Sequence, residues 1–315
     1  MPDLGPFPSA LRDAILAWYG SRGRSLPFRG TTDPYAILVS EAMAQQTQVA
    51  RAGETWIRFM ERFPTAAALA AATPADVLRA WQGLGYNRRA LNLWRAARRI
   101  VEVHGGRVPA DLAALQALPG VGPYTARAVA ALAFGMPVGA VDTNVRRVLG
   151  RIVAGDSAAL GATALQKVAD AAVPLDRPGA WTHALMDVGA TSCRPGRPDC
   201  ASCPAQAWCR FAAAELAGGN RARPVPGARS VTGPAATAAR EAPPAFATTS
   251  RWLRGRIVDQ LRAAQDGAWI VLDAPIGEHD RAAVAAALEA LARDGLVELD
   301  GADPTAARRA RLPIR

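Results

Sequence analysis

The chain has 315 residues, half of them hydrophobic, and a formal net charge of +10 at pH 7. This length predicts two domains, and the composition suffices for a large buried core. No run reaches about 18 uncharged apolar residues, and the first residues lack a secretory signal, so we expect a cytoplasmic protein without membrane spans. The basic charge favours a polyanionic partner, either nucleic acid or an anionic membrane surface.

Residues 9–212 are predicted to form a run of helices joined by short loops. Hydrophobic residues recur at helical spacing, for example at Leu11, Ile15 and Trp18. Abundant alanine favours helix over strand, and Gly or Pro breaks separate the segments. Little alternation of period two is present, so we expect an all-α domain over residues 1–215.

Residues 216–250 are rich in Gly, Pro, Ala and Thr, and this composition predicts a flexible linker. A helix at about 251–264, an apolar run at 269–272, a second helix at about 279–294 and a hairpin-like end follow. This order suggests a small winged-helix-like module over residues 251–315. Its second helix has few basic residues, so we expect the module to pack on the helical domain rather than to bind DNA.

The segment LPGVGPYTARAVAALA, residues 118–133, places Gly120 and Gly122 in a turn between two predicted helices. Glycines allow a tight turn, and the amides at the start of the second helix can face an anion. A helix-hairpin-helix grips a DNA phosphate in this way without reading sequence. Taken alone, the pattern fits an ordinary helical hairpin better.

All four cysteines fall within 17 residues, which argues for a metal site rather than a disulfide framework. Four thiolates hold zinc or a 4Fe-4S cluster, and the presence of a single C-x2-C unit favours iron–sulfur. Arg194 and Arg197 between the first two cysteines are candidates to approach phosphates. The four candidate ligands are Cys193, Cys200, Cys203 and Cys209.

Two carboxyl groups are candidates for catalysis. Glu41 lies in an apolar helical stretch, where desolvation favours its protonated form and suits a general acid, although a solvated helix glutamate is the ordinary interpretation. Asp142 precedes a predicted helix, where it acts either as an N-cap or as a carboxylate facing developing positive charge. Gln45, Gln46 and Thr47 form a polar patch suited to base edges or to the gap left by an extruded base.

The order and spacing of these motifs resemble the helix-hairpin-helix base-excision DNA glycosylases that carry an iron–sulfur cluster, over about residues 9–212. The resemblance implies two α-helical lobes with double-stranded DNA bound across the cleft. The helix-hairpin-helix, Glu41 and Asp142 would lie near that cleft, and no membrane partner is expected. The 4Fe-4S cluster would be structural and would orient DNA, rather than act as a redox catalyst.

Two branches of this family differ at the residue that follows the glycine turn. The endonuclease III branch has a lysine nucleophile there and cuts the strand as a lyase, whereas this chain has Tyr124. The sole lysine, Lys167, lies outside every motif. Hydrolysis by water, without a lysine-based lyase step, is therefore expected.

The adenine glycosylase branch carries S-E-x-M-x-Q-Q-T, which matches residues 40–47. It also carries Gly-Leu-Gly-Tyr, which matches residues 83–86 and implies that Tyr86 contacts the partner strand. Its Asp-x-Asn motif matches Asp142 and Asn144. Thymine mismatch glycosylases also have a tyrosine after the turn and Val-Asp-x-Asn, so these features do not discriminate, whereas the two glutamines favour adenine.

The chain departs from the adenine branch at Ala44, Asn87 and Phe28, where larger apolar or aromatic residues are usual. The usual C-terminal domain, which resembles a nucleotide hydrolase and senses 8-oxoguanine, is not evident in the residues that follow the linker. The sequence therefore supports adenine excision but carries no feature that supports a preference for 8-oxoguanine as the opposite base.

We expect a monomer. The resemblance implies a monofunctional enzyme that flips adenine out of a mispair with 8-oxoguanine or guanine. Glu41 would protonate adenine N7, and ionised Asp142 would stabilise the oxocarbenium-like sugar, while Tyr124 and Asn144 orient the carboxylates and water. The alternatives are a thymine or uracil mismatch glycosylase, a non-catalytic DNA-damage-binding protein and, remotely, a zinc-binding transcription factor.

Overall fold

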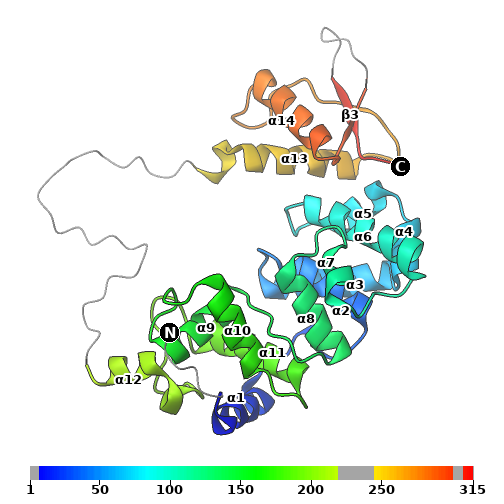
Figure 1. Ribbon diagram of the computed structural model, residues 1–315. Coiled ribbons are helices and arrows are strands. Elements are labelled where there is room, and N and C mark those ends of the chain that lie inside the picture. Colours follow the sequence, from blue (N-terminus) through cyan, green and yellow to red (C-terminus); the bar gives the residue numbers. More distant parts are fainter. Residues whose placement is uncertain (1–6, 219–244, 301–307, 315) are drawn as a thin grey trace, which may run out of the picture. The chain divides into compact units, whose positions relative to one another are not determined.

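The computed structural model describes residues 7–218, 245–300 and 308–314, and almost all of its regular structure is helical (Figure 1). The all-α prediction is therefore confirmed. The chain forms two compact units. The first unit comprises Met1–Leu38, Ala110–Ala117 and Val121–Ala235, and the second comprises Val39–Pro109, Leu118–Gly120 and Ala236–Arg315. Most of the predicted linker, residues 219–244, lies outside the described residues.

The first unit is built around α11, which packs against α1, α8 and α9. Its core surrounds Trp181 and Val188 of α11 and takes in Leu11 and Ile15, two residues of the predicted helical stripe. Proline at the first turn starts both α8 and α11, where a missing N–H costs no hydrogen bond. Its helices are α1 (Ser9–Arg22), η1 (Pro27–Arg29), α7 (Leu112–Gln116), α8 (Pro123–Phe134), α9 (Thr143–Ala154), α10 (Ala162–Ala172), α11 (Pro178–Thr191), η2 (Gln206–Trp208) and α12 (Arg210–Leu216).

The helical part of the second unit packs α4 against α6. Thr73 begins α5 with a capping box, since its side chain accepts from the amide of Asp76 and the Asp76 carboxylate accepts in return. The rings of Phe59 and Trp81 meet edge to face with centroids 6.0 Å apart in the core. Its helices are α3 (Val49–Arg62), α4 (Ala66–Ala71), α5 (Pro74–Ala80) and α6 (Arg88–His104), and α2 (Pro34–Ala44) runs from the first unit into the second.

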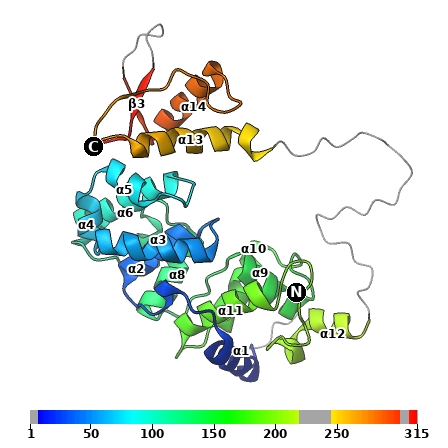
Figure 2. The ribbon, with the colours of Figure 1, turned by 180° about the vertical axis from the view of Figure 1, so that it is seen from behind.

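The second unit also contains a small C-terminal module of two helices and a three-stranded antiparallel sheet in the order β1-β3-β2. Ile270 pairs with Ala310, and Glu298 pairs with Arg311. The module has the helices and the small sheet of the predicted winged-helix-like arrangement, and its first long helix contacts α5 (Figure 2). The elements are η3 (Phe246–Thr248), α13 (Ser250–Ala263), β1 (Ile270–Val271), α14 (Arg281–Arg293), β2 (Glu298–Leu299) and β3 (Arg309–Arg311).

No helix among the described residues is long and apolar enough to cross a membrane.

Candidate active site

The glycine turn forms a hairpin between α7 and α8, which contact each other. Gly120 has φ +78°, and a Cβ there would lie 2.7 Å from Cβ of Asn92, so this position requires glycine for two reasons. Gly122 is the N-cap of α8, and the helix begins without a side-chain cap. The start of α8 therefore has the geometry of an anion-binding helix end, while phosphate binding by this hairpin stays a prediction.

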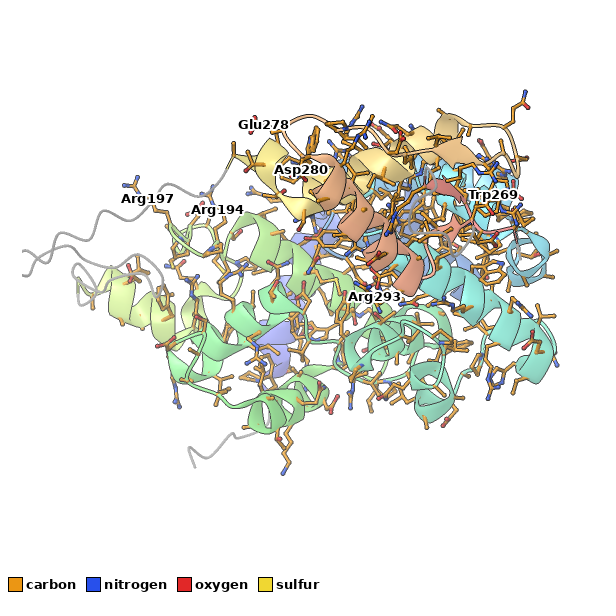
Figure 3. The ribbon with its side chains drawn as sticks, turned by 90° about the horizontal axis from the view of Figure 1, so that it is seen from above. Arg194, Arg197, Trp269, Glu278, Asp280 and Arg293 are labelled. Carbon is orange, nitrogen blue, oxygen red and sulfur yellow. The ribbon has the colours of Figure 1, made fainter. Side chains whose placement is uncertain are left out.

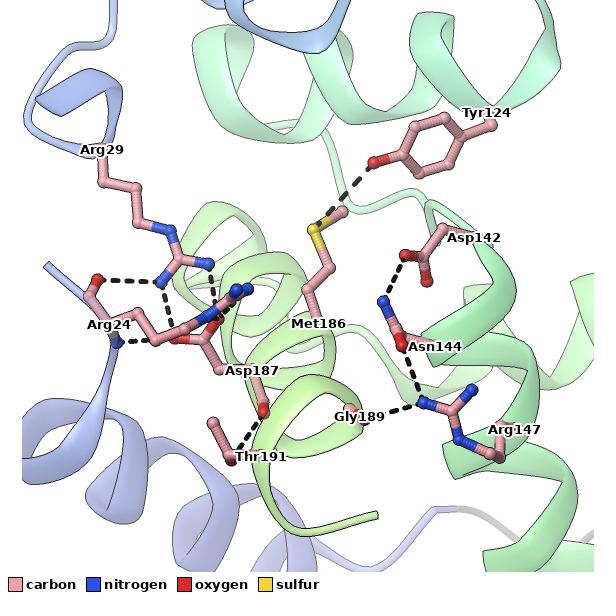
Figure 4. Close-up of polar contacts among 10 residues, drawn as sticks. All are labelled: Arg24, Arg29, Tyr124, Asp142, Asn144, Arg147, Met186, Asp187, Gly189 and Thr191. Atoms are coloured by element: carbon pink, nitrogen blue, oxygen red, sulfur yellow. Dashed lines mark hydrogen bonds and ion pairs between the residues drawn. The ribbon is translucent and has the colours of Figure 1, made fainter. Parts of the chain in front are cut away.

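Asp142 is the N-cap of α9, which confirms one of its two sequence interpretations. One carboxyl oxygen accepts from the amide of Val145 at 2.6 Å. The other accepts from the side-chain amide of Asn144 at 3.0 Å (Figure 4). The partial positive charge of the helix start stabilises negative charge at this carboxyl group. The geometry thus holds a half-buried carboxylate in one orientation, which suits stabilisation of a cation.

Arg147, one turn into α9, is a residue that the sequence analysis missed. Its guanidinium donates to the Asn144 side chain at 2.7 Å, to the Gly189 carbonyl at 2.7 Å and to the Cys193 carbonyl at 2.6 Å. Gly189 allows the close approach, because a Cβ there would lie 2.6 Å from Cβ of Asn144. The first cysteine of the cluster is thereby joined to Asp142 by consecutive hydrogen bonds. The spacing of Asn144 and Arg147, three residues apart on one helix, is the only local sequence signal.

Tyr124 lies in the first turn of α8, and its side chain is half-buried. Its hydroxyl lies 4.0 Å from the sulfur of Met186 on α11, and Figure 4 shows it directed at that sulfur. The orienting role expected of Tyr124 stays a prediction.

Glu41 lies on α2, in the second unit, and its side chain is half-buried. Its helix neighbours Val39 and Met43 are buried apolar residues, and Ser40 is buried as well. Its role as the acid stays a prediction.

The turn after α2, residues 45–47, is fastened by Arg89 of α6. The Arg89 guanidinium donates to the carbonyls of Ala42 and Met43 at 2.9 and 3.0 Å, to the Gln45 carbonyl, and to the Thr47 hydroxyl at 3.1 Å. Burial lowers the pKa of Arg89 to about 10. Gln46 is exposed with φ +52°, so the turn presents its side chain to solvent. No local sequence pattern points to this role of Arg89.

The Arg89 guanidinium also donates to the carbonyls of Leu84 and Gly85 at 3.1 and 3.2 Å. One arginine therefore connects the Gln45–Thr47 turn to the loop before Tyr86. Tyr86 has φ +45°, an uncommon backbone conformation for an aromatic residue, and its surface is 41% exposed. Strained backbone that the surroundings hold in place is a frequent mark of a functional position.

The four cysteines are free thiols gathered at α12 and the loop before it, on the core of the first unit. Burial first, and then the neighbouring thiols, raise the pKa of Cys200 and of Cys203 to about 11. Arg151 lies 3.3 Å from the Cys193 sulfur, where its charge would balance thiolate ligands. Four thiols beside a cationic side chain are the donor types that a four-thiolate metal group uses. Within the residues that the structure describes, however, no three such side chains are brought into metal-binding geometry.

Arg194 and Arg197 are exposed on the loop that follows the first cysteine, and Figure 3 shows both side chains projecting outward. Arg151 supports the backbone of this loop by donating to the carbonyls of Arg194 and Pro195 at 2.9 and 3.1 Å. Phosphate binding by the two exposed arginines stays a prediction.

A buried carboxylate that the sequence analysis did not single out is Asp187 of α11. Arg29 donates to both of its oxygens at 2.6 Å, and Arg24 donates through its Nε at 2.7 Å and its amide at 2.8 Å. Burial alone raises the pKa of Asp187, but the hydrogen bonds from Arg29 and Arg24 outweigh it and lower the pKa. The cluster anchors the segment that contains η1 to α11.

Comparisons with known proteins agree with this architecture. Residues 39–171 match the HhH-GPD superfamily of base excision DNA repair proteins. An adenine DNA glycosylase of Mycolicibacterium smegmatis is 40% identical over 294 residues, which cover 90% of this chain and 91% of that protein.

Two solved structures share the fold. A thermostable thymine-DNA glycosylase aligns with a TM-score of 0.61 and 31% identity over 64% of this chain and 94% of that chain. An endonuclease III trapped as a covalent intermediate with DNA aligns with a TM-score of 0.56 and 24% identity over 65% of this chain and 95% of that chain.

Proposed function

The chain belongs to the adenine DNA glycosylases of the HhH-GPD superfamily, and from this premise we propose that it hydrolyses the N-glycosidic bond of adenine mispaired with 8-oxoguanine or guanine. The chain is a DNA glycosylase, and what we propose is the identity of the excised base and of the base opposite it. The observation that carries it is the likeness, over nine tenths of both chains, to an adenine DNA glycosylase. The Ser40–Thr47 motif and the fixed carboxyl group of Asp142 support it.

Adenine must leave the base stack to be reached, and its anion is a poor leaving group. We assign the proton transfer to Glu41, which gives its proton to N7 as the bond between C1′ and N9 breaks. The carboxylate left on Glu41 then accepts a proton from water as the water oxygen bonds to C1′. General acid catalysis of this kind contributes about 10² to 10⁴ in rate.

Asp142 stabilises the positive charge that develops on the sugar. Its two hydrogen bonds, from Val145 and Asn144, hold the carboxylate before the substrate arrives, so the site need not reorganise during the reaction. Arg147 keeps Asn144 in place. Tyr124 at the start of α8 orients the water or the carboxylates.

The proposed reaction ends with a free base and an intact strand. Tyr124 stands where a lyase of this superfamily carries lysine, and Lys167 is exposed on α10. Without an amine at the turn no Schiff base forms at C1′, and water is the nucleophile.

Cys193, Cys200, Cys203 and Cys209 would hold a 4Fe-4S cluster, which is a general feature of this type of glycosylase. When bound, the cluster supplies structural cross-linking of four thiolates rather than redox chemistry. Arg147 and Arg151 orient the cysteine loop by donating hydrogen bonds to its backbone carbonyls. In this orientation the side chains of Arg194 and Arg197 project outward.

The proposed organisation is a catalytic domain over residues 1–215, a linker over 216–250 and a module over 251–315. We propose that the protein acts as a monomer on mispaired double-stranded DNA in the cytoplasm. A thymine or uracil mismatch glycosylase is the second candidate, favoured by the thymine-DNA glycosylase among the structural neighbours and by Tyr124.

Single-turnover assays on duplexes with A, T or U opposite G or 8-oxoguanine separate the candidates. Release of adenine with no strand break supports the proposal. Release of thymine or uracil alone would reassign the substrate and leave the roles of the two carboxyl groups standing.

A further inference from the structure

Two arginines connect the C-terminal module to the rest of the second unit, because each donates hydrogen bonds to backbone carbonyls near the end of the other's helix. Arg262 of α13 donates to the carbonyl of Leu78, near the end of α5, at 2.9 Å and to the side chain of Asn87 at 2.8 Å. Arg79 of α5 donates to the carbonyls of Arg262 and Ala264, at the end of α13, at 3.3 and 3.2 Å. A cation at a helix C-terminus donates to carbonyls that lack a partner within the helix, and it interacts favourably with the negative end of the helix dipole. These hydrogen bonds therefore stabilise the ends of both α5 and α13.

This contact reaches the loop that ends in Tyr86. Asn87, one of the positions at which the chain departs from the adenine branch, is the residue that receives the Arg262 hydrogen bond. Arg251, the second residue of α13, places its guanidinium carbon 4.1 Å from the centre of the Tyr86 ring. The module therefore touches the side chain of Tyr86 as well as its neighbour.

Arg251 differs from the other arginines of α13 in its partners. Arg254 pairs with Asp294, and Arg256 and Arg262 both pair with Asp259. Arg251 is exposed, and within residues 7–218, 245–300 and 308–314 no carboxylate lies within ion-pair distance of it. Its charge is thus held beside an aromatic ring by a cation–π contact and stays available to an anion.

We propose that α13 is a second DNA-contacting element, in which Arg251 binds a phosphate of the strand opposite the excised base and positions the Tyr86 ring against that strand. The choice of strand rests on the proposed function, which gives Tyr86 the partner strand. A guanidinium beside an aromatic side chain is the combination that nucleic-acid grooves use to hold a backbone and stack a base. The docked module is therefore part of the binding surface, whereas the sequence predicted packing alone.

The test uses the full chain and needs no catalysis. A duplex with a tetrahydrofuran abasic site opposite 8-oxoguanine is titrated by fluorescence anisotropy over a range of KCl concentrations. Arg251→Gln should weaken binding about tenfold and reduce the slope of log K against log salt by about 1, the loss of one phosphate contact. Arg251→Lys keeps the charge and should keep the slope. Arg256→Gln is the matched control, since it removes the same charge from the same helix at an ion-paired position.

Neutral methylphosphonates, placed singly in either strand, identify the phosphate. The wild type should lose affinity when one phosphate opposite the abasic site is neutralised, and Arg251→Gln should be insensitive to that substitution. Equal effects of Arg251→Gln and Arg256→Gln, or a sensitive phosphate only in the strand with the abasic site, would overturn the proposal.

A variant that weakens the contact between the C-terminal module and α5 tests whether this contact positions Arg251 against the loop that ends in Tyr86. Arg262→Gln should increase amide hydrogen exchange in residues 83–89 and reproduce the loss of salt slope, because Arg251 no longer reaches Tyr86. An unchanged slope together with faster exchange would show that docking does not position Arg251. If the wild type binds as described but releases no adenine, the proposed function fails while this inference is judged separately by the phosphate map.

Discussion

The guanidinium of Arg147 donates a hydrogen bond of 2.7 Å to the side-chain oxygen of Asn144. The amide of Asn144 donates to Asp142 at 3.0 Å, and the same guanidinium donates to the carbonyl of Cys193 at 2.6 Å. The loop that carries the cysteines is thus connected to the proposed catalytic carboxylate through side chains of a single helix, α9.

Replacing Arg147 with alanine should lower the single-turnover excision rate by about 10- to 100-fold, because a displaced Asn144 leaves Asp142 with one hydrogen bond and less defined geometry. Quenched-flow measurement at saturating enzyme gives the rate, and iron content is checked in the same preparation. Arg146→Ala is the control, since Arg146 takes no part in these hydrogen bonds. A rate equal to that of the wild type in the alanine variant, with the cluster retained, would show that the connection has no catalytic effect.

The stability of the first unit should depend on pH through His183. Burial, and then the nearby Arg29, lower the pKa of His183 from 6.5 to about 4, although Asp187 acts in the opposite direction. The unfolded chain therefore takes up a proton at higher pH than the folded chain does. This contribution to stability is complete above pH 6.5 and is lost as pH falls from about 6.5 to 4.

Urea unfolding measured at intervals across that window checks the prediction. In the wild type the free energy of unfolding should decrease as the pH is lowered, and in His183→Gln this decrease should be less steep. His104→Gln, at the end of α6, provides a histidine control. A decline of equal steepness in the wild type and His183→Gln would assign the pH dependence to other groups.

The all-α character was predicted from the sequence, because several helices have a local cause. Asp142 precedes its helix as a short polar acceptor, and prolines begin α8 and α11, so their starts could be expected from the residue types alone. The hydrophobic spacing of Leu11 and Ile15 likewise gave the buried face of α1 correctly.

The structural roles of Arg89 and Arg262 were not predictable from the sequence. Arg89 fastens carbonyls more than 40 residues away, and Arg262 reaches Leu78 and Asn87 across more than 170 residues. A long side chain that donates to backbone carbonyls leaves no pattern in a sequence, since any residue supplies the acceptor. The tertiary fold alone brings donor and carbonyl together.

Replacing Cys203 with serine should abolish the brown colour and the bound iron of anaerobically purified protein. The thermal unfolding midpoint should also fall, because metal binding by four thiolates contributes directly to folding of the segment that holds them. Ser202→Ala, one residue away, should keep both properties. Full iron content in Cys203→Ser would show that Cys203 is not a ligand. Bound zinc instead of iron in the wild type would show that the four cysteines form a zinc site.

Borohydride should trap no covalent complex between this protein and DNA, because no lysine follows the glycine turn and Lys167 is exposed on α10. Denaturing gels after reduction, with an endonuclease III as the positive control, make the measurement. Lys167→Ala should excise at the wild-type rate. A trapped species that disappears in Lys167→Ala would establish a lyase step through that residue.

The most direct test of the central claim is single-turnover release of adenine from a duplex with adenine opposite 8-oxoguanine, by the wild type and by Glu41→Gln. We expect the wild type to release adenine and leave the strand intact. Glu41→Gln should bind the duplex equally well but react slower by about 10² to 10⁴, since it has no proton to give to N7. Adenine release at the wild-type rate by Glu41→Gln would contradict the assignment of the acid, and no adenine release by the wild type would contradict the proposed function itself.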